Sequence, residues 1–390
     1  MSQRFFLYIA LLWLLGNALR LTILAVPPVI PAIHADLALS GTGVGVLGGL
    51  PVVLFAVVAL PGSLLIALLG PVRVVVVGLL LIAVAGALRG AVPAVTWLYA
   101  TTILMASGVA IMQPAMPTLV RLWTPHRIGF ATAIYSNGLL MGGIFPTLLT
   151  IPVVLPLVHH SWPLALAFWS APVFAIAVLV LFTVSGQRGP ATPARRPHWW
   201  PNWRDGLIWR LGLTFGSVNA MYFSTNTFVP DYLTASGRPD LISATLSALN
   251  FGQLPASLLL LGLAVRLERR KWPFVAFGLM CFASIIGIAT SASAWTVLWA
   301  ALLGFAAAGV LVLVLVLPPL LRPPAEVAPI SAGMMTVSYG LGMVTAVASG
   351  ALWDVTAVPA AAFVPIGLCS LLLLVVPTTI SFTRRTQSVP

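Results

Sequence analysis

The sequence predicts an all-α membrane protein with twelve transmembrane helices, arranged in two six-helix halves with both termini in the cytoplasm. Hydrophobic residues make up 60% of the 390-residue chain and charged residues only 7%, whereas about a quarter of an ordinary soluble domain is charged. Apolar runs of about 20 residues, the length that a hydrocarbon layer of ~30 Å requires, recur along the chain. A third observation, the uneven distribution of cations between alternate loops, orients these runs.

The expected helices lie between charged residues or Pro and Gly breaks. They cover residues 7–33, 44–67, 72–89, 95–119, 129–152, 162–184, 206–232, 241–265, 272–291, 295–320, 327–351 and 358–380. The first run is longer than the core of a signal peptide, and no small-residue cleavage site follows it before the polar loop. We therefore expect it to be retained as a membrane helix.

Cations indicate which loops are cytoplasmic. With both termini inside, sixteen of the nineteen Lys and Arg residues fall in inner loops or tails, and only Arg89 and Arg238 fall outside. The remaining cation, Arg20, lies within the first run. Basic inner loops beside anionic lipid account for the net charge of +12 without a nucleic-acid partner. We expect a multi-pass monomer in the bacterial inner membrane.

A polar segment and a weak internal repeat define the two halves. The predicted domains are residues 1–184, a cytoplasmic linker at 185–205 that is rich in Pro, Arg and Trp, and residues 206–390. Asn17 and Asn219 each precede a proline, Pro28 and Pro230, by eleven positions. "GVAIMQPAMPTLVR" in the fourth run also aligns without a gap with "GVLVLVLVLPPLLR" in the tenth. Such repeats are typical of transporters.

Arg20 is the residue that this topology does not explain. It lies about 20 Å from the inner end of its helix, and Asn17 lies one turn away on the same face. All seven acidic residues fall near the ends of runs, so no intramembrane carboxylate is available to balance the guanidinium. A substrate anion would supply the missing charge, because the guanidinium donates hydrogen bonds as a fork. The alternative is an arginine satisfied by backbone carbonyls and water.

Further polar residues within the runs either line a substrate site or bond neighbouring helices, and the sequence does not separate these roles. They are Gln113, Asn137, Asn219, Tyr222, Asn226, Asn250, Gln253 and Tyr339. Tyr222 takes the place of Arg20 in the repeat. Asp36 and Asp231, at the outer ends of runs, are candidate gating residues.

The absence of acidic residues and histidine from the middles of the runs argues against other classes of protein. An intramembrane enzyme needs a Ser/His pair, paired Asp residues or a metal cluster there. We expect no cofactor and no metal, since His159 and His160 have no neighbouring Cys or carboxylate. A receptor that binds a ligand without transporting it remains open, although we expect no signalling domain.

Several segments resemble a known family. "GNALRLTILAVPPVIPAI", "LPVVLFAVVALPGSLL", "GVAIMQPAMPTLVR", "NGLLMGG" and "FGSVNAMYFSTNTFVPDYL" are similar to the cyanate-permease and 2-nitroimidazole-transporter branch of the major facilitator superfamily. In that branch the first helix carries Asn-x-x-Arg, which matches Asn17 and Arg20, and the fourth carries a Gln before Met-Pro, which matches Gln113. The resemblance implies the major facilitator fold with alternating access.

The sequence departs from the superfamily at its inner-gate loop. Of the usual Gly-x-x-x-Asp-x-x-Gly-Arg-Lys pattern, "GSLLIALLGPVRVV" keeps only Gly62, Gly70 and Arg73, and the corresponding "VRLERRKWP" keeps Glu268. The resemblance implies gating roles for Arg73 and Glu268, without the aspartate that normally locks this gate. The leading expectation is a secondary transporter of a small anion or small polar organic compound, anchored by Arg20. The alternative is efflux of a neutral, nitroimidazole-like compound, with Arg20 structural.

Overall fold

The computed structural model describes residues 3–184, 201–267, 270–322 and 324–381, and these residues are helical nearly throughout. The first half contains α1 (Gln3–Leu24), η1 (Pro27–Val29), α2 (Ile30–Leu37), α3 (Gly41–Leu69), α4 (Pro71–Leu88), α5 (Val95–Met112), α6 (Ala115–Trp123), α7 (Ile128–Leu149), η2 (Thr150–Val154), α8 (Leu155–Leu157) and α9 (Trp162–Val184). The second contains α10 (Gly206–Ala235), η3 (Pro239–Leu241), α11 (Ile242–Phe251), α12 (Gln253–Leu267), α13 (Trp272–Thr290), α14 (Trp295–Leu321), α15 (Pro324–Thr356), η4 (Pro359–Ala362), α16 (Phe363–Val375) and η5 (Val376–Thr379).

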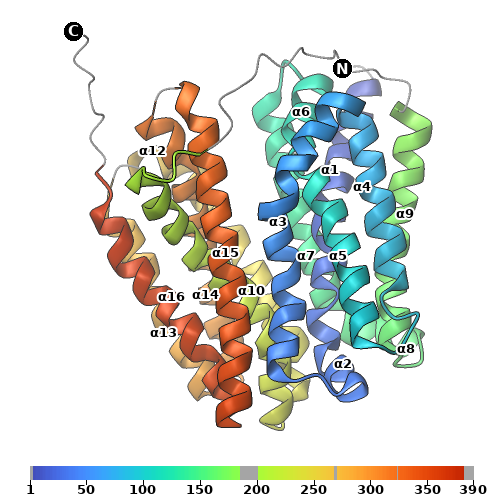
Figure 1. Cartoon of the computed structure of the whole chain (residues 1–390), viewed down its shortest axis with the longest axis vertical. Coiled ribbons are helices and arrows are strands. Elements are labelled where there is room, and N and C mark those ends of the chain that lie inside the picture. The colour runs from blue at the N-terminus through green and yellow to red at the C-terminus, as the bar shows by residue number, and fades with distance from the viewer. Residues whose placement is uncertain (1–2, 185–200, 268–269, 323, 382–390) are drawn as a thin grey trace.

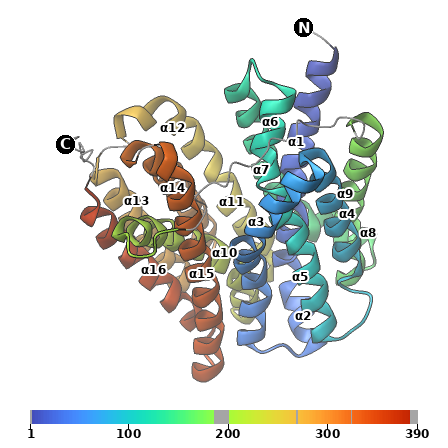
Figure 2. The ribbon, with the colours of Figure 1, turned by 45° about the horizontal axis from the view of Figure 1, so that its top comes forward.

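The helices gather into two bundles that stand side by side (Figure 1). Helices α1 to α9 form one bundle and α10 to α16 the other, and they meet where α3 packs on α15 and α10 and where α7 packs on α11. Figure 2 shows the bundles diverging toward the end where α1 begins and η5 ends. The bundles therefore touch most closely at the opposite end.

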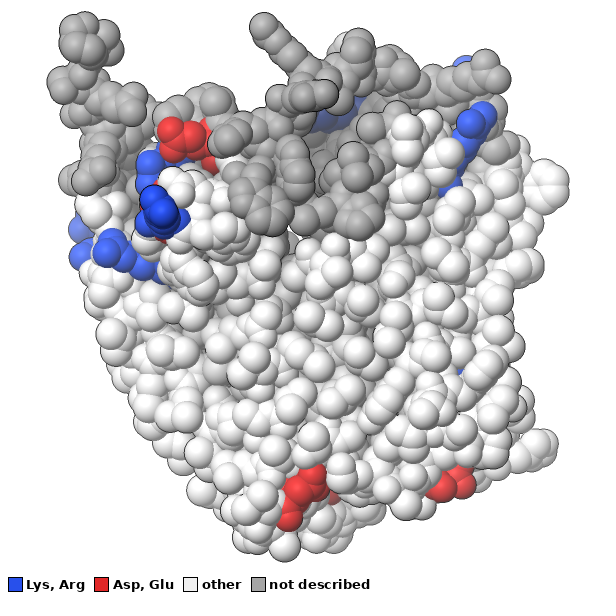
Figure 3. Space-filling model, in the orientation of Figure 1, with Lys and Arg blue, Asp and Glu red and all other residues white. Residues whose placement is uncertain are grey.

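Charged side chains mark the two ends of the molecule. On the face shown in Figure 3, Lys and Arg gather near the end where α1 begins, together with a few acidic side chains. The opposite end shows acidic side chains alone, and the broad band between the two ends carries almost no charge. We call the first the basic end, because the start of α4 with Arg73, α6 with Arg121 and the start of α13 after Lys271 lie there. We call the second the acidic end, because α2 with Asp36 and the end of α15 with Asp354 lie there. An uncharged belt between polar ends is what a bilayer requires.

Ten helices among the described residues are long and apolar enough to cross a membrane. The two predicted runs that do not reach this standard are those of α10 and of α11 with α12. Helix α10 is long enough at 30 residues but carries several polar residues, and nearly every side chain from Thr214 to Leu233 is buried. Its neighbours α14, α15, α16 and α3 cover it, so its polar groups face protein rather than lipid.

Helix breaks lie beside the interior of the molecule. α1 ends before Pro27 and Pro28, α5 is capped by Gln113 before Pro114, and α11 is capped by Gly252. Proline removes a backbone donor and glycine gives the chain freedom, so each break is explained by its sequence. Broken helices in transporters expose backbone and polar side chains to an interior site, and Gln113 occupies such a break.

Candidate functional site

A cavity of about 170 Å³ lies between the two bundles. Residues of α1, α3, α5 and α7 form one wall, and residues of α10, α14 and α15 form the other. The lining residues are Leu19, Arg20, Ile23, Leu24, Phe55, Val109, Gln113, Leu139, Phe215, Asn219, Phe223, Leu311, Leu315, Met335 and Tyr339. Apolar side chains with a few convergent polar groups are typical of a small-molecule site.

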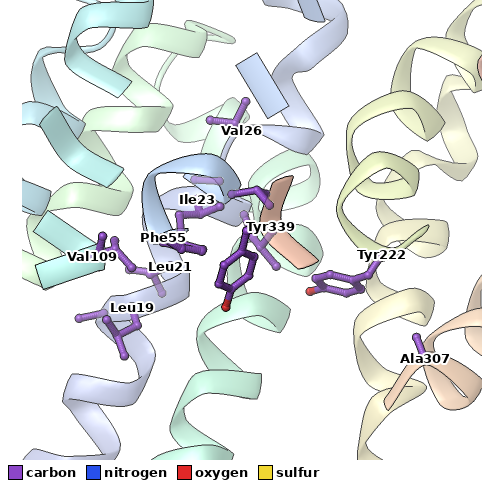
Figure 4. Close-up of a cluster of buried hydrophobic side chains, with 14 of the residues drawn as sticks. Leu19, Leu21, Ile23, Val26, Phe55, Val109, Tyr222, Ala307 and Tyr339 are labelled. Atoms are coloured by element: carbon purple, nitrogen blue, oxygen red, sulfur yellow. The ribbon is translucent and has the colours of Figure 1, made fainter. Parts of the chain in front are cut away.

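Arg20 lines this cavity from α1 and reaches across to the other bundle. Its Nη1 donates to the hydroxyl of Tyr222 at 3.4 Å, and its Cζ lies 5.4 Å from the centre of the Tyr222 ring, a cation–π arrangement. In Figure 4 the ring of Tyr222 extends from α10 toward the side where Leu19 and Tyr339 lie. Among the described residues no carboxylate forms an ion pair with Arg20.

Tyr222 continues into a polar network inside the second bundle. Its hydroxyl donates to Asn250 Oδ1 at 2.6 Å, and Gln253 Nε2 donates to the same oxygen at 3.4 Å. Asn250 Nδ2 in turn donates to Leu246 O at 2.8 Å and to Asn226 Oδ1 at 3.5 Å. Asn250, Gln253 and Asn226 therefore lie behind Tyr222 and outside the lining of the 170 Å³ cavity. Tyr222 itself connects this network to Arg20.

The other predicted site residues divide between the cavity and helix contacts. Gln113, Asn219 and Tyr339 line the cavity, and Asn219 Nδ2 also donates to Ser338 Oγ at 2.8 Å. The rings of Tyr339 and Phe55 meet edge to face, with their centres 5.5 Å apart, and join α15 to α3.

Asn17 and Asn137 lie at the contact of α1 with α7 instead of in the cavity lining. Trp13 Nε1 donates to Asn137 Oδ1 at 2.9 Å, and Asn17 Nδ2 donates to Trp13 O at 3.1 Å. The helices approach so closely that a Cβ on Gly142 would overlap the carbonyl of Asn17. One turn separates Asn17 from Arg20, yet only the arginine reaches the cavity.

Side chains from both bundles meet at the acidic end. His34 Nδ1 of α2 lies 2.8 Å from Asp231 Oδ2 of α10. Asp354 of α15 caps the start of α3: its Oδ1 accepts from Gly41 N at 2.6 Å, and its Oδ2 accepts from Thr42 N at 2.8 Å and Thr42 Oγ1 at 2.6 Å. A carboxylate at a helix N-terminus satisfies unpaired N–H groups and opposes the helix dipole. These contacts hold the acidic end closed.

Of the three predicted gating residues that the structure describes, only Asp231 makes such a contact. Asp231 pairs across the bundles, but Asp36 is exposed and accepts from Trp162 Nε1 of its own bundle at 3.0 Å. Arg73 is exposed at the start of α4, and Glu268 lies outside the described residues. Sequence reasoning missed His34 and Asp354 as contact residues. The sequence did place Asp354 at the outer end of its helix, which could have indicated a contact there. Nothing in the sequence indicated that its partner is the start of α3.

Arg89 is a second cation in the interior of the molecule, which the sequence analysis did not anticipate. The sequence assigned Arg89 to the outer side of the membrane by loop position alone, and the structure shows its side chain fully buried at the end of α4. The guanidinium turns inward instead of reaching water: Nη2 donates to Thr22 O of α1 at 2.8 Å, and Nε donates to Gly86 O at 3.3 Å. A long side chain at a helix end can turn either way, and loop counting does not detect the direction.

Two helical bundles enclose a cavity with a few polar side chains, and contacts between the bundles close one end of it. This arrangement is that of a multi-pass membrane transporter. The chain belongs to the Major Facilitator Superfamily, whose sequence pattern matches residues 12–347. The fold and relatives are those of secondary transporters of small substrates rather than of enzymes.

Two relatives and one solved structure illustrate the similarity. The chain is 29% identical over 347 residues to the cyanate transport protein CynX of Escherichia coli, covering 85% of each chain. It is 25% identical over 307 residues to the 2-nitroimidazole transporter of the same organism, covering 78% of this chain and 77% of that one. The structure of the nucleoside transporter NupG matches with a TM-score of 0.75 at 10% identity, covering 97% of this chain and 100% of the other.

Proposed function

We propose that this transporter moves a small anion across the bacterial inner membrane by alternating access, with Arg20 binding the anion in the 170 Å³ cavity. The observation that carries the proposal is a guanidinium in a mostly apolar cavity between the bundles that has no described carboxylate partner. An unbalanced charge inside a membrane protein is costly, and a bound anion removes that cost. The relative named for cyanate transport supports this substrate class.

The topology proposed with this function keeps twelve crossings and cytoplasmic termini. Helix α10 and the pair α11 and α12 then cross as interior helices, and the basic end faces the cytoplasm, as the excess of Lys and Arg favours. Residues 1–184 and 206–390 are the two moving bodies, joined by the linker at 185–205. The protein acts as a monomer with the substrate and membrane lipid as its partners.

A neutral nitroimidazole-like substrate is the second candidate. It is favoured by the apolar lining of the cavity and by the relative named a 2-nitroimidazole transporter. In this case Arg20 has a structural role, and its hydrogen bond to Tyr222 stabilises the guanidinium without a bound anion.

Binding to the purified protein distinguishes the two candidates. We expect sodium cyanate, nitrate or formate to raise the melting temperature relative to sodium chloride at the same ionic strength, because a ligand at 100 times its Kd stabilises the folded state by about 2.7 kcal/mol. The Arg20→Gln variant should lose this shift. A shift with 2-nitroimidazole alone, retained in Arg20→Gln, would contradict the anion proposal.

Tyr222→Phe should weaken anion transport moderately. The variant keeps the ring under Arg20 but removes the hydroxyl that accepts from Nη1 and donates to Asn250. A hydrogen bond is worth about 0.5–1.5 kcal/mol, so the KM for labelled cyanate in proteoliposomes should rise about two- to tenfold. Tyr232→Phe, on the same helix but bonded to Ala289 O away from the cavity, should leave the KM unchanged. Equal KM values in the two variants would exclude a positioning role for the Tyr222 hydroxyl.

A further inference from the structure

A second, smaller cavity lies between the central cavity and the closed acidic end. It measures about 20 Å³ and shares Ile23, Leu24 and Phe223 with the lining of the central cavity. Its other lining residues include Pro27 and Thr227. Along α10 the order is Phe223 in both cavities, Thr227 in the small cavity alone and Asp231 at the closing contact. The small cavity is thus the next position on a path from the central cavity to the acidic end.

Two buried polar groups that have no partner among the described residues line this small cavity. Arg89 uses Nη2 and Nε for carbonyl oxygens, but its Nη1 is buried and no described residue accepts from it. Thr102 Oγ1 is likewise buried without a partner, and both residues line the same cavity. Buried donors without acceptors are rare and cost about 1–3 kcal/mol, more for a charged group. Such groups commonly await a ligand or water.

The anchoring of Arg89 suits it to bind rather than to swing freely. Its two bonds to Thr22 O and Gly86 O hold the guanidinium across α1 and α4, within one bundle. Asn226 of the other bundle lines the same cavity and belongs to the network that leads through Asn250 and Tyr222 to Arg20. The polar network that begins at Arg20 therefore ends at Asn226, in the same small cavity that Arg89 lines.

We propose that Arg89, with Thr102 and Asn226, forms a second anion subsite that receives the substrate when the acidic end opens. This inference rests on the proposed function. The present volume admits about one water molecule, so the subsite accepts an anion only after the bundles part at the acidic end. Arg89 Nη1 then donates to the anion before it passes Phe223 and reaches Arg20. An anion that leaves the cell meets Arg20 first and Arg89 second.

The test is the KM for labelled cyanate on each side of the membrane, measured in right-side-out and inside-out vesicles. Arg89→Gln should raise the KM at the acidic side at least about tenfold and change the KM at the basic side less than about twofold. Arg20→Lys should impair both sides. Arg238→Gln is the matched control, because it removes an exposed cation paired with Asp240 near the acidic end, and it should change neither value.

A second variant keeps the test decisive if Arg89→Gln does not fold. Asn226→Asp retains Arg89 but adds a carboxylate that competes for Nη1, so it should also raise the KM at the acidic side selectively. Equal changes on both sides, or no change at the acidic side in either variant, would overturn the subsite. The proposed function would still stand if Arg20→Lys raised the KM on both sides. Absence of cyanate transport in the wild type, with binding of neutral nitroimidazole, would overturn both.

Discussion

Arg20→Ala is expected to lower the affinity for a small anion at least about 100-fold while leaving the empty protein at least as stable as the wild type. The loss follows because a charged hydrogen bond is worth about 1.5–3 kcal/mol and a guanidinium can make two to one anion. The stability follows because removing an uncompensated charge relieves an insertion cost of about 2.5–3.5 kcal/mol. Cyanate titration of the purified variants, together with their melting temperatures, measures both effects.

Two further variants sharpen this prediction. Arg20→Lys keeps the charge but loses the fork, and we expect about a tenfold loss of affinity. Arg210→Ala is the control, because this arginine likewise donates from Nη1, to Thr379 O at 3.0 Å, but lies exposed at the basic end. Wild-type affinity in Arg20→Ala would refute the anion site, and a fall in its melting temperature would favour the structural role.

Gly350→Val should block transport by preventing closure of the acidic end. A Cβ on Gly350 of α15 would overlap the carbonyl of Gly41 of α3, so the two helices could not approach as they do here. Glycine at such a crossing allows backbone contact. We expect transport to fall more than about tenfold, with the central cavity more accessible from the acidic side.

Cysteine labelling reports that accessibility directly. The native cysteines, Cys281 and Cys369, are buried, so Phe223→Cys, in the lining of both cavities, provides the reporter. An impermeant maleimide added outside should label it faster in the Gly350→Val background than in Gly340→Val. Gly340 is the matched control on the same helix, because no atom beyond its chain neighbours and its own helix backbone lies within 4 Å of its added Cβ. Equal labelling rates in the two backgrounds would rule out that the Gly350→Val side chain keeps the acidic end open.

The sequence predicted the helices well because their lengths and apolar character are local properties. It also identified Arg20 as exceptional, since a charge within an apolar run is visible without coordinates. It could not separate Asn17 and Asn137 from the cavity residues, because a polar side chain that joins α1 to α7 has the same sequence signature as one that lines a cavity.

The contacts that close the acidic end depend on the packing of distant segments. Asp354 meets Gly41 across 313 positions of sequence, and no local pattern predicts which helix N-terminus a carboxylate will cap. The interior position of the Arg89 side chain was not predicted for a different reason. Counting loop cations uses only the position of a residue along the chain, whereas the contacts of Arg89 depend on the direction in which its side chain turns.

The interior position of α10 also bears on how the protein is made. Its Asn and Tyr side chains bond to partners on α11 and α15, both of which leave the ribosome after α10. A nascent α10 facing lipid would leave those groups unpaired, at a cost of several kcal/mol for each backbone-like polar group. Stable membrane integration of the second bundle therefore depends on later segments, and truncation before α15 should leave α10 open to quality-control proteolysis.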